Sequence, residues 1–328
     1  MMHVGALLRL DRTRPPPLLD ALPMGRAARL LLDEGIVVVL ADRASHNRVS
    51  GYVATADGWK EAHDVAIVGA YDRYPRPKYP QDHARLLDAL SGIVVGNPPS
   101  IRELSRDKLI SQRLMQDHGV PMPPVEADPD AFDDALNRWG AAFAKPRFGA
   151  GGAGVERVVA GDDVAPVRPG ALGELEPTLL QRAVPPPAGW YGIATRTIVQ
   201  RDADQSWVCA PTVARRSPSD WVVNVARGAE PVAAVDVLGS DTVDAIVNAS
   251  TLTARALASE PEGDRLLEIG VDAMVDADGV PWVIEVNTRP WGRLSALYAR
   301  DPDRWEHAHV QTVARPFRAL AGRAAQAR

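Results

Sequence analysis

The sequence predicts a protein of mixed class, in which an α/β domain precedes α+β domains. Over about the first 100 residues, apolar runs typical of short buried strands alternate with stretches of helical spacing. Beyond residue 187 most apolar runs are strand-like, and the proline-rich VPPPAG at residues 184–189 predicts a hinge before them. A chain of 328 residues is long enough for two or three domains.

The N-terminal domain is expected to span residues 1–99. Its expected strands cover residues 4–10, 36–41, 65–70 and 93–95, and its expected helices cover residues 24–34 and 81–89. This alternation favours a small α/β domain with a largely parallel sheet. The first strand runs into DRTRPPP without a glycine fingerprint, so no dinucleotide site is expected there.

Two further domains are expected, at residues 100–187 and 188–328. The first should begin with one helix over residues 100–118, capped by Ser100 and ended by Gly119. It should continue with a helix at residues 129–139 and a strand at 141–145. In the last domain we expect strands at residues 193–200, 207–214 and 221–225, a helix at 241–258, a hairpin at 271–287 and a helical tail from 302.

Composition restricts the classes of function. Hydrophobic residues make up 46% and charged residues 24%, which is typical of a globular protein. The net charge of −5 argues against a nucleic-acid partner, and no run approaches the ~20 apolar residues of a membrane span. The N-terminus lacks the apolar region of a signal peptide, and the single Cys209 is interpreted as a small core residue. We therefore expect a cytoplasmic enzyme or binding protein without a nucleic-acid or membrane partner.

Polar side chains gather on one face of the expected hairpin. Asp278-Gly279 is a strong two-residue turn signal, and this turn would place Asp272 opposite Glu285. Asn287 shares the face of Glu285, because side chains two apart on a strand point the same way. A four-residue turn would shift the pairing but keep the faces. The opposite face is expected to be apolar and to carry Val271, Ala273, Val275, Trp282, Ile284 and Val286.

Two carboxylates and an amide oxygen on one face are ligands suited to Mg²⁺. Carboxylates this close repel one another unless a cation lies between them. Mg²⁺ prefers oxygen ligands and keeps water or phosphate oxygens in its other positions. The alternative is a solvated strand face on which the acids are incidental.

A lysine and a glycine-rich loop form a second constellation, in FAKPRFGAGGAGV at residues 143–155. Lys145 ends a strand, and its loop can bring backbone N–H groups onto phosphate oxygens. The loop glycines are Gly149, Gly151, Gly152 and Gly154. The loop is not a Walker loop, because no Lys-Ser/Thr pair closes it. Glycines and prolines in the following residues also argue against the helix of a Rossmann fold. The alternative is a flexible glycine turn without a ligand.

Lysine usage supports a role for two of these positions. Of 37 basic residues, only Lys60, Lys78, Lys108 and Lys145 are lysines. Lys108 lies in RDKL at an expected helix start, and Lys145 precedes the glycine loop. In a chain that otherwise uses arginine, the lysines that persist are expected to have a functional reason.

Taken in order, these elements resemble the ATP-grasp superfamily. The resemblance rests on RDKL, the GVPMPP step, Lys145 with its glycine loop, and the closing D…E-x-N triplet. Within the superfamily, the chain most resembles the spore-coat-associated ATP-grasp proteins. It also has some similarity to D-alanine–D-alanine ligases in EVNTRPWG. The resemblance implies an ATP-grasp fold from about residue 98 onward, with residues 1–99 as the pre-ATP-grasp domain.

The resemblance also implies ligands and their residues. Two subdomains would grip ATP, with Lys108 and Lys145 as nucleotide ligands and the glycine loop as a lid over the phosphates. The adenine would meet the hinge at Gln181, Arg182 and Val184. The Mg²⁺ ligands would be Asp272, Glu285 and Asn287, and Asn224 corresponds to a family asparagine. Members often carry an acidic residue for the ribose near the hinge, where this chain has Gln181 and Arg182.

Four arginines are candidates for catalytic contacts. Arg196 and Arg215 occupy strands that line the phosphate and acyl-phosphate site in the resembled family. Arg289 and Arg293 directly follow the metal strand and are candidates for the carboxylate of the substrate, because a guanidinium binds oxyanions through two hydrogen bonds. The alternative for Arg196 and Arg215 is a surface arginine in an arginine-rich chain.

The expected function is that of most family members, an ATP-dependent carboxylate–amine ligase. It would join a small-molecule or peptide carboxylate to an amine through an acyl phosphate, and would release ADP and phosphate. Two alternatives stay open: a kinase of the same fold, and a non-catalytic nucleotide-binding structural or regulatory protein. The sequence specifies neither the acid nor the amine, and it leaves a homodimer open.

Overall fold

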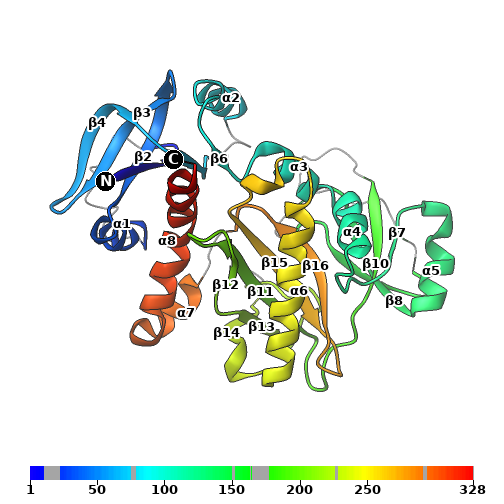
Figure 1. Cartoon of the computed structure of the whole chain (residues 1–328). Helices are drawn as coiled ribbons and strands as arrows, with labels where there is room; N and C mark the ends of the chain where they lie inside the picture. The colour runs from blue at the N-terminus through cyan, green and yellow to red at the C-terminus, as the bar shows by residue number, and fades with distance from the viewer. Residues whose placement is uncertain are drawn as a thin grey trace.

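A computed structural model of the chain contains three β-sheets with helices packed against them (Figure 1). The structure describes residues 1–10, 23–74, 79–149, 152–162, 164, 177–225, 228–290 and 294–327. Each sheet lies within one of the three expected residue ranges. The limits between domains stay a prediction, because helices from one range pack against the sheet of another.

The N-terminal sheet has the strand order β4-β3-β2-β1-β5-β6. Its strands are β1 (Met2–Leu7), β2 (Ile36–Ser45), β3 (Arg48–Thr55), β4 (Gly58–Ala66), β5 (Gly69–Asp72) and β6 (Val95–Gly96). Strands β2, β1, β5 and β6 are parallel as expected, whereas β3 and β4 add two antiparallel pairs. The chain reverses at His46 and Asn47, whose positive φ angles of 48° and 60° form a tight hairpin turn. The expected strand at residues 65–70 is therefore divided between β4 and β5.

The C-terminal helix belongs to the core of the N-terminal sheet. Helices α1 (Pro23–Asp33) and α2 (Pro80–Asp88) lie where the sequence predicts them. Helix α8 (Pro302–Gln326) packs beside α1, and its Val313 and Phe317 share a core with Leu31 and Tyr71 (Figure 1). The two ends of the chain thus fold together.

The central sheet is small and antiparallel in all its pairs. Its order is β7-β10-β8-β9, formed by β7 (Val125–Glu126), β10 (Thr178–Arg182), β8 (Ala141–Pro146) and β9 (Glu156–Val159). A 3-10 turn (Pro129–Ala131) and helix α5 (Phe132–Trp139) cover it, as the sequence predicts. Strand β9 follows the glycine loop where a Rossmann fold would have a helix.

The expected helix at residues 100–118 is two helices, α3 (Pro99–Arg106) and α4 (Lys108–Asp117). Asp107 separates them and caps α4, because its carboxylate accepts hydrogen bonds from the N–H groups of Leu109 and Ile110 at 3.1 and 3.2 Å. Ser100 does not cap a helix; its hydroxyl donates to Glu262. Lys108 is therefore the first residue of a helix, as expected.

The third sheet has the order β14-β13-β11-β15-β16, and β12 pairs with β11. Its strands are β11 (Gly192–Arg201), β12 (Trp207–Cys209), β13 (Val213–Ser217), β14 (Glu230–Ala233), β15 (Glu268–Val275) and β16 (Pro281–Asn287). Helix α6 (Ser240–Ala258) covers one face (Figure 1), and α7 (Ser295–Arg300) packs on α8. The expected strand at 207–214 is divided into β12 and β13, and residues 221–225 form no strand.

The hairpin of β15 and β16 confirms the predicted pairing of Asp272 with Glu285. The turn is longer than predicted, because the N–H of Asp276 donates to the carbonyl of Val280 at 3.0 Å. Near the turn the register is consequently shifted by one residue, and a bulge beside Asp272 restores the predicted pairing.

The bulge also changes one predicted face. Trp282 and Ile284 were expected on the apolar core face, but they pack with Met274 on the opposite side of the sheet. Val283 takes the core position beside Val271. A bulge places two consecutive residues opposite one, so strict alternation fails at this point. Among the described residues, no helix is long and apolar enough to span a membrane.

Candidate functional site

A cavity of about 180 Å³ lies between the central sheet and the third sheet. It brings together most of the residues predicted from the sequence. The predicted residues that line it are Lys108, Lys145, Gly149, Gly152, Gln181, Arg182, Val184, Arg196, Arg215, Asp272, Glu285 and Asn287, with Asn224. Gly154 and Arg289 do not line it, and Gly151 and Arg293 lie outside the described residues.

The two candidate lysines enter the cavity from separate elements. Lys145, near the end of β8, donates a hydrogen bond of 2.8 Å to the side-chain Oε1 of Gln181 on β10. Lys108, at the start of α4, donates to the carbonyl of Gly149 at 2.8 Å. Burial lowers the pKa of Lys145 to about 7; the carboxylate of Glu285 opposes this effect and Lys108 adds to it.

The carboxylate of Asp272 is held by two guanidinium groups. Arg196 on β11 donates from Nε and Nη2 to its two oxygens, with an Nε–Oδ1 distance of 2.9 Å. Arg215 on β13 donates from Nη2 to Oδ1 at 2.6 Å, and Asn287 donates from Nδ2 to Oδ2 at 3.0 Å. Burial opposes ionisation of Asp272, but these arginines outweigh it and lower its pKa.

Glu285 has a different environment from Asp272. Burial, followed by the charge of Asp272, raises the pKa of Glu285, although Lys108 and Lys145 act in the opposite direction. Its carboxylate makes no hydrogen bond with the described residues and lines the cavity. A half-buried carboxylate without a hydrogen-bond donor is a strong candidate to bind a cation.

The donor set fits Mg²⁺ bound together with phosphate oxygens. In the described part of the chain, no group of three His, Cys, Asp or Glu side chains could hold a metal alone. Asp272 and Glu285 face each other across the hairpin, and the Oδ1 of Asn287 is left as an acceptor while its Nδ2 donates. Mg²⁺ completes such partial oxygen sites with water and substrate phosphates.

The cavity has a strong excess of positive charge. Its lining contains five cationic side chains and two carboxylates, Asp272 and Glu285. The cations are Lys108, Lys145, Arg182, Arg196 and Arg215. A partly enclosed site with more cationic than anionic side chains attracts a multiply charged anion, such as a nucleoside triphosphate with its metal.

Apolar residues of the cavity were not identified from the sequence. Trp221, Val222 and Val223 line it, in the segment that was expected to be a strand. A methyl group on Gly152 would lie 3.6 Å from Val222, so the loop lies close to this segment at Gly152. Arg157 stacks over the ring of Trp221 at 4.1 Å. No periodic signal could have assigned these residues, because the segment is irregular.

A polar residue that no sequence pattern singled out, Gln112, supports the hinge. Gln112 on α4 accepts a hydrogen bond of 3.2 Å from Gln181 and donates one of 2.7 Å to the carbonyl of Pro123. Gln181 is thereby fixed between Gln112 and Lys145. A neutral amide thus occupies the position beside the lysine.

The chain has the ATP-grasp fold. Its defining features here are two sheets that enclose the cavity, two lysines beside a glycine loop, and the D…E-x-N hairpin. The predicted fold class, with an N-terminal α/β domain, is confirmed. More particularly, residues 192–312 match a family model described as YheC/D like ATP-grasp. The closer resemblance to spore-coat-associated proteins stays a prediction.

Solved structures of ligases share this fold. D-alanyl-alanine synthetase A from Vibrio cholerae aligns with a TM-score of 0.58 and 14% identity over 98% of both chains. D-alanine–D-alanine ligase from Bacillus anthracis aligns with a TM-score of 0.55 and 13% identity over 100% of both. The ATP-grasp ligase PsnB, complexed with minimal precursor, Mg and ADP, aligns with a TM-score of 0.53 and 18% identity. The alignment covers 94% of this chain and 97% of PsnB. No curated protein sequence matched the chain.

Proposed function

We propose that the protein is an ATP-dependent ligase that joins a carboxylate to an amine through an acyl phosphate. The observation that carries the proposal is the pairing, in one cationic cavity, of Glu285 with Asp272 and Asn287 beneath a glycine loop. The carboxylate of Glu285 has no hydrogen bond to any described residue. The ligases of the same fold named above support this reaction class. The proposed cofactors are ATP and Mg²⁺.

Each part of the cavity has a role in binding ATP. Lys108 and Lys145 bind phosphate oxygens, and the hinge residues Gln181, Arg182 and Val184 bind the adenine. Glu285, Asp272 and Asn287 hold Mg²⁺, which when bound neutralises phosphate charge. The glycine loop and the segment with Trp221 exclude water from the phosphates.

The arginines are assigned to the oxyanions of the reaction. A substrate carboxylate oxygen attacks the γ-phosphorus, and the bond to ADP breaks. An amine then attacks the acyl carbon, inorganic phosphate leaves with its oxygen, and the amine loses a proton. Arg196 and Arg215 bind the carboxylate of Asp272 and line the same cavity, which supports assigning them to the negative charge that develops beside it.

Exclusion of water explains why such a site suits an acyl phosphate. A carboxylate is a poor acyl donor until phosphorylation makes its oxygen a good leaving group. The intermediate must then meet an amine before water reaches it. Holding the amine beside it contributes ~7–11 kcal/mol through effective molarity.

Hydroxylamine trapping tests this proposal. The protein is incubated with Mg-ATP and pools of amino acids and peptides, and ADP release identifies the acid. We expect that acid to give a hydroxamate with one ADP and one phosphate for each product. A stable phosphorylated product without hydroxamate would instead establish a kinase. Tight nucleotide binding without ADP formation from any pool would favour the non-catalytic alternative.

A further inference from the structure

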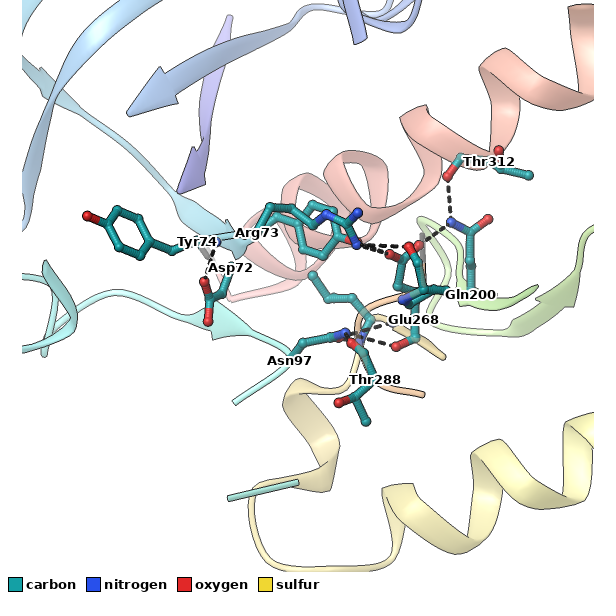
Figure 2. A network of polar contacts seen from close by, with 11 residues as sticks. Asp72, Arg73, Tyr74, Asn97, Gln200, Glu268, Thr288 and Thr312 are labelled. Carbon is teal, nitrogen blue, oxygen red and sulfur yellow. Dashed lines mark hydrogen bonds and ion pairs between the residues drawn. The ribbon is translucent and has the colours of Figure 1, made fainter. Parts of the chain in front are cut away.

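A buried polar network joins the N-terminal sheet to the third sheet (Figure 2). Its centre is Glu268 on β15, whose side chain is 0% exposed. Glu268 accepts hydrogen bonds from Tyr71 and Arg73, which come from the end of β5, and from Gln200 on β11 at 2.8 Å. Gln200 also donates to the carbonyl of Thr312 on α8 at 2.6 Å. The network therefore links three regions of the chain.

The same network fixes the segment that follows the metal residue Asn287. Asn97, after β6, donates from Nδ2 to the carbonyls of Glu268, at 2.9 Å, and of Thr288. Arg73 donates from Nη1 to the carbonyl of Pro290 at 3.2 Å. Residues of the N-terminal domain thus hold the backbone on both sides of Arg289, as Figure 2 shows for Thr288.

Arg289 itself leaves two donor nitrogens without an acceptor in this junction. Its Nε and Nη2 atoms are buried and have no hydrogen-bond partner. Burial lowers its pKa to about 10, while the nearby charges of Asp72 and Glu268 raise it and those of Arg73 and Arg102 lower it. Leaving such buried donors unpaired is unfavourable, and a bound acceptor would offset this loss.

Other arginines with a buried, unbonded Nε have a different explanation. Four of them lie over tryptophan rings at 4.0–5.1 Å: Arg157, Arg182, Arg201 and Arg216. A fifth, Arg215, binds Asp272 through Nη2. Among the described residues, only Arg289 has two such buried nitrogens without a partner.

The acids near Arg289 are already engaged. Asp72 accepts from the N–H of Tyr74 at 2.9 Å, and its other oxygen lies 2.9 Å from Nε2 of His83. That oxygen is 3.9 Å from Nη1 of Arg102 on α3. Glu268 is occupied by the network. The charges that act on Arg289 are thus mixed: the guanidinium groups of Arg73 and Arg102 repel it, and the carboxylates of Asp72 and Glu268 attract it.

The unpaired atoms of Arg289 are the edge of a guanidinium that matches a carboxylate. Elsewhere in this protein, Arg196, Arg147 and Arg318 each donate from Nε and Nη2 to both oxygens of one carboxylate. Two parallel hydrogen bonds of this kind select planar oxyanions. A carboxylate is consequently the ligand that the edge fits.

We infer that Arg289, with Arg102 beside it, forms a carboxylate subsite between the N-terminal domain and the third sheet. The inference rests on the proposed function, since it assigns the subsite to one of the ligase substrates. Arg289 follows Asn287 by two residues, so their Cα atoms are at most about 6–7 Å apart, yet Arg289 does not line the nucleotide cavity. The subsite therefore holds a carboxylate that does not react, and one substrate carries such a group besides its reacting one.

Acetate binding to arginine-labelled protein tests the subsite directly. Protein with ¹⁵N-labelled arginine is saturated with Mg-ADP, and the Nε signal lost in Arg289→Lys is assigned to Arg289. Acetate, inorganic phosphate and chloride are then titrated at constant ionic strength. We expect acetate to shift this signal with saturation, and Arg102→Gln to weaken that binding about tenfold, which corresponds to ~1.4 kcal/mol. Arg304→Gln, at an exposed pair with Asp236, should leave it unchanged.

Each other outcome overturns the inference. An equal shift with chloride would reduce the effect to charge screening. Phosphate binding at least tenfold tighter than acetate would assign the edge to a phosphate group rather than to a carboxylate. The absence of any acetate shift in protein that binds Mg-ADP would remove the subsite and leave the nucleotide site intact, whereas failure to bind Mg-ADP would contradict the proposed function itself.

Discussion

The ammonium of Lys145 donates a hydrogen bond of 2.8 Å to a neutral acceptor, the Oε1 atom of Gln181. The two residues lie on the adjacent strands β8 and β10, and Gln112 holds the amide from its other side. Because an amide does not neutralise the lysine, its charge is left for an anionic ligand. A carboxylate at position 181 would instead compete with that ligand.

Replacing Lys145 tests its role as a nucleotide ligand. Lys145→Ala should weaken Mg-ADP binding at least tenfold, because a hydrogen bond to a charged group contributes about 1.5–3 kcal/mol. Lys60→Ala is the matched control, since Lys60 is exposed on β4 and far from the cavity. Calorimetric titration measures both affinities. Equal losses in the two variants would reduce the effect to general surface charge.

The pH dependence of binding follows from the lowered pKa of Lys145. Its pKa is about 7 in the ligand-free protein, so above pH 7 the side chain is increasingly neutral. Phosphate groups favour the charged form and raise the pKa in the complex, so binding takes up a proton and weakens as pH rises. The affinity can fall at most tenfold for each unit of pH, because one proton is taken up.

Titrations of ADP without metal between about pH 7.5 and 9, in buffers of different ionisation enthalpy, measure this proton uptake. Lys145→Arg is the control, because arginine stays charged over this range. If ADP affinity depends on pH equally in the native protein and in the Lys145→Arg variant, another group takes up the proton.

Glu285→Gln should abolish Mg²⁺-dependent turnover without loss of the fold. The amide keeps the shape of the side chain but removes the charge that binds the cation. Because burial raises the pKa of Glu285, its removal should leave the unfolding midpoint unchanged or higher. The control is Asp278→Asn, an exposed residue in the turn of the same hairpin. Normal Mg²⁺-dependent ATP use by the Glu285 variant would contradict the metal assignment.

Glu268→Gln should destabilise the junction between the N-terminal domain and the third sheet. The substitution removes the carboxylate that lies 3.2 Å from the buried guanidinium of Arg73, and breaking a buried ion pair in this way costs about 3–5 kcal/mol. Denaturant unfolding measures the change, with Glu306→Gln as the control at an exposed ion pair. If both variants unfold alike, the network contributes no more than a surface pair.

The sequence by itself determined the local chemistry of the site. The spacing of Glu285 and Asn287, the turn signal before them, and a glycine loop directly after Lys145 are short-range patterns. Such patterns specify which side chains share a strand face, because side chains alternate along a strand. The pairing of Asp272 with Glu285 also belongs here, since a hairpin brings together residues that are close in sequence.

Tertiary structure decided what those residues contact. Arg196 and Arg215 reach Asp272 because β11 lies between β13 and β15, an order that periodicity does not encode. The break between α3 and α4 depends partly on Arg147, which binds the capping Asp107 from a distant segment at 2.6 Å. Likewise, α8 packs on the N-terminal sheet, so that Thr312 and Asn97 meet the same network. Helical and strand periodicity report which face of an element is apolar, whereas the partner of that face is fixed only when the whole chain packs.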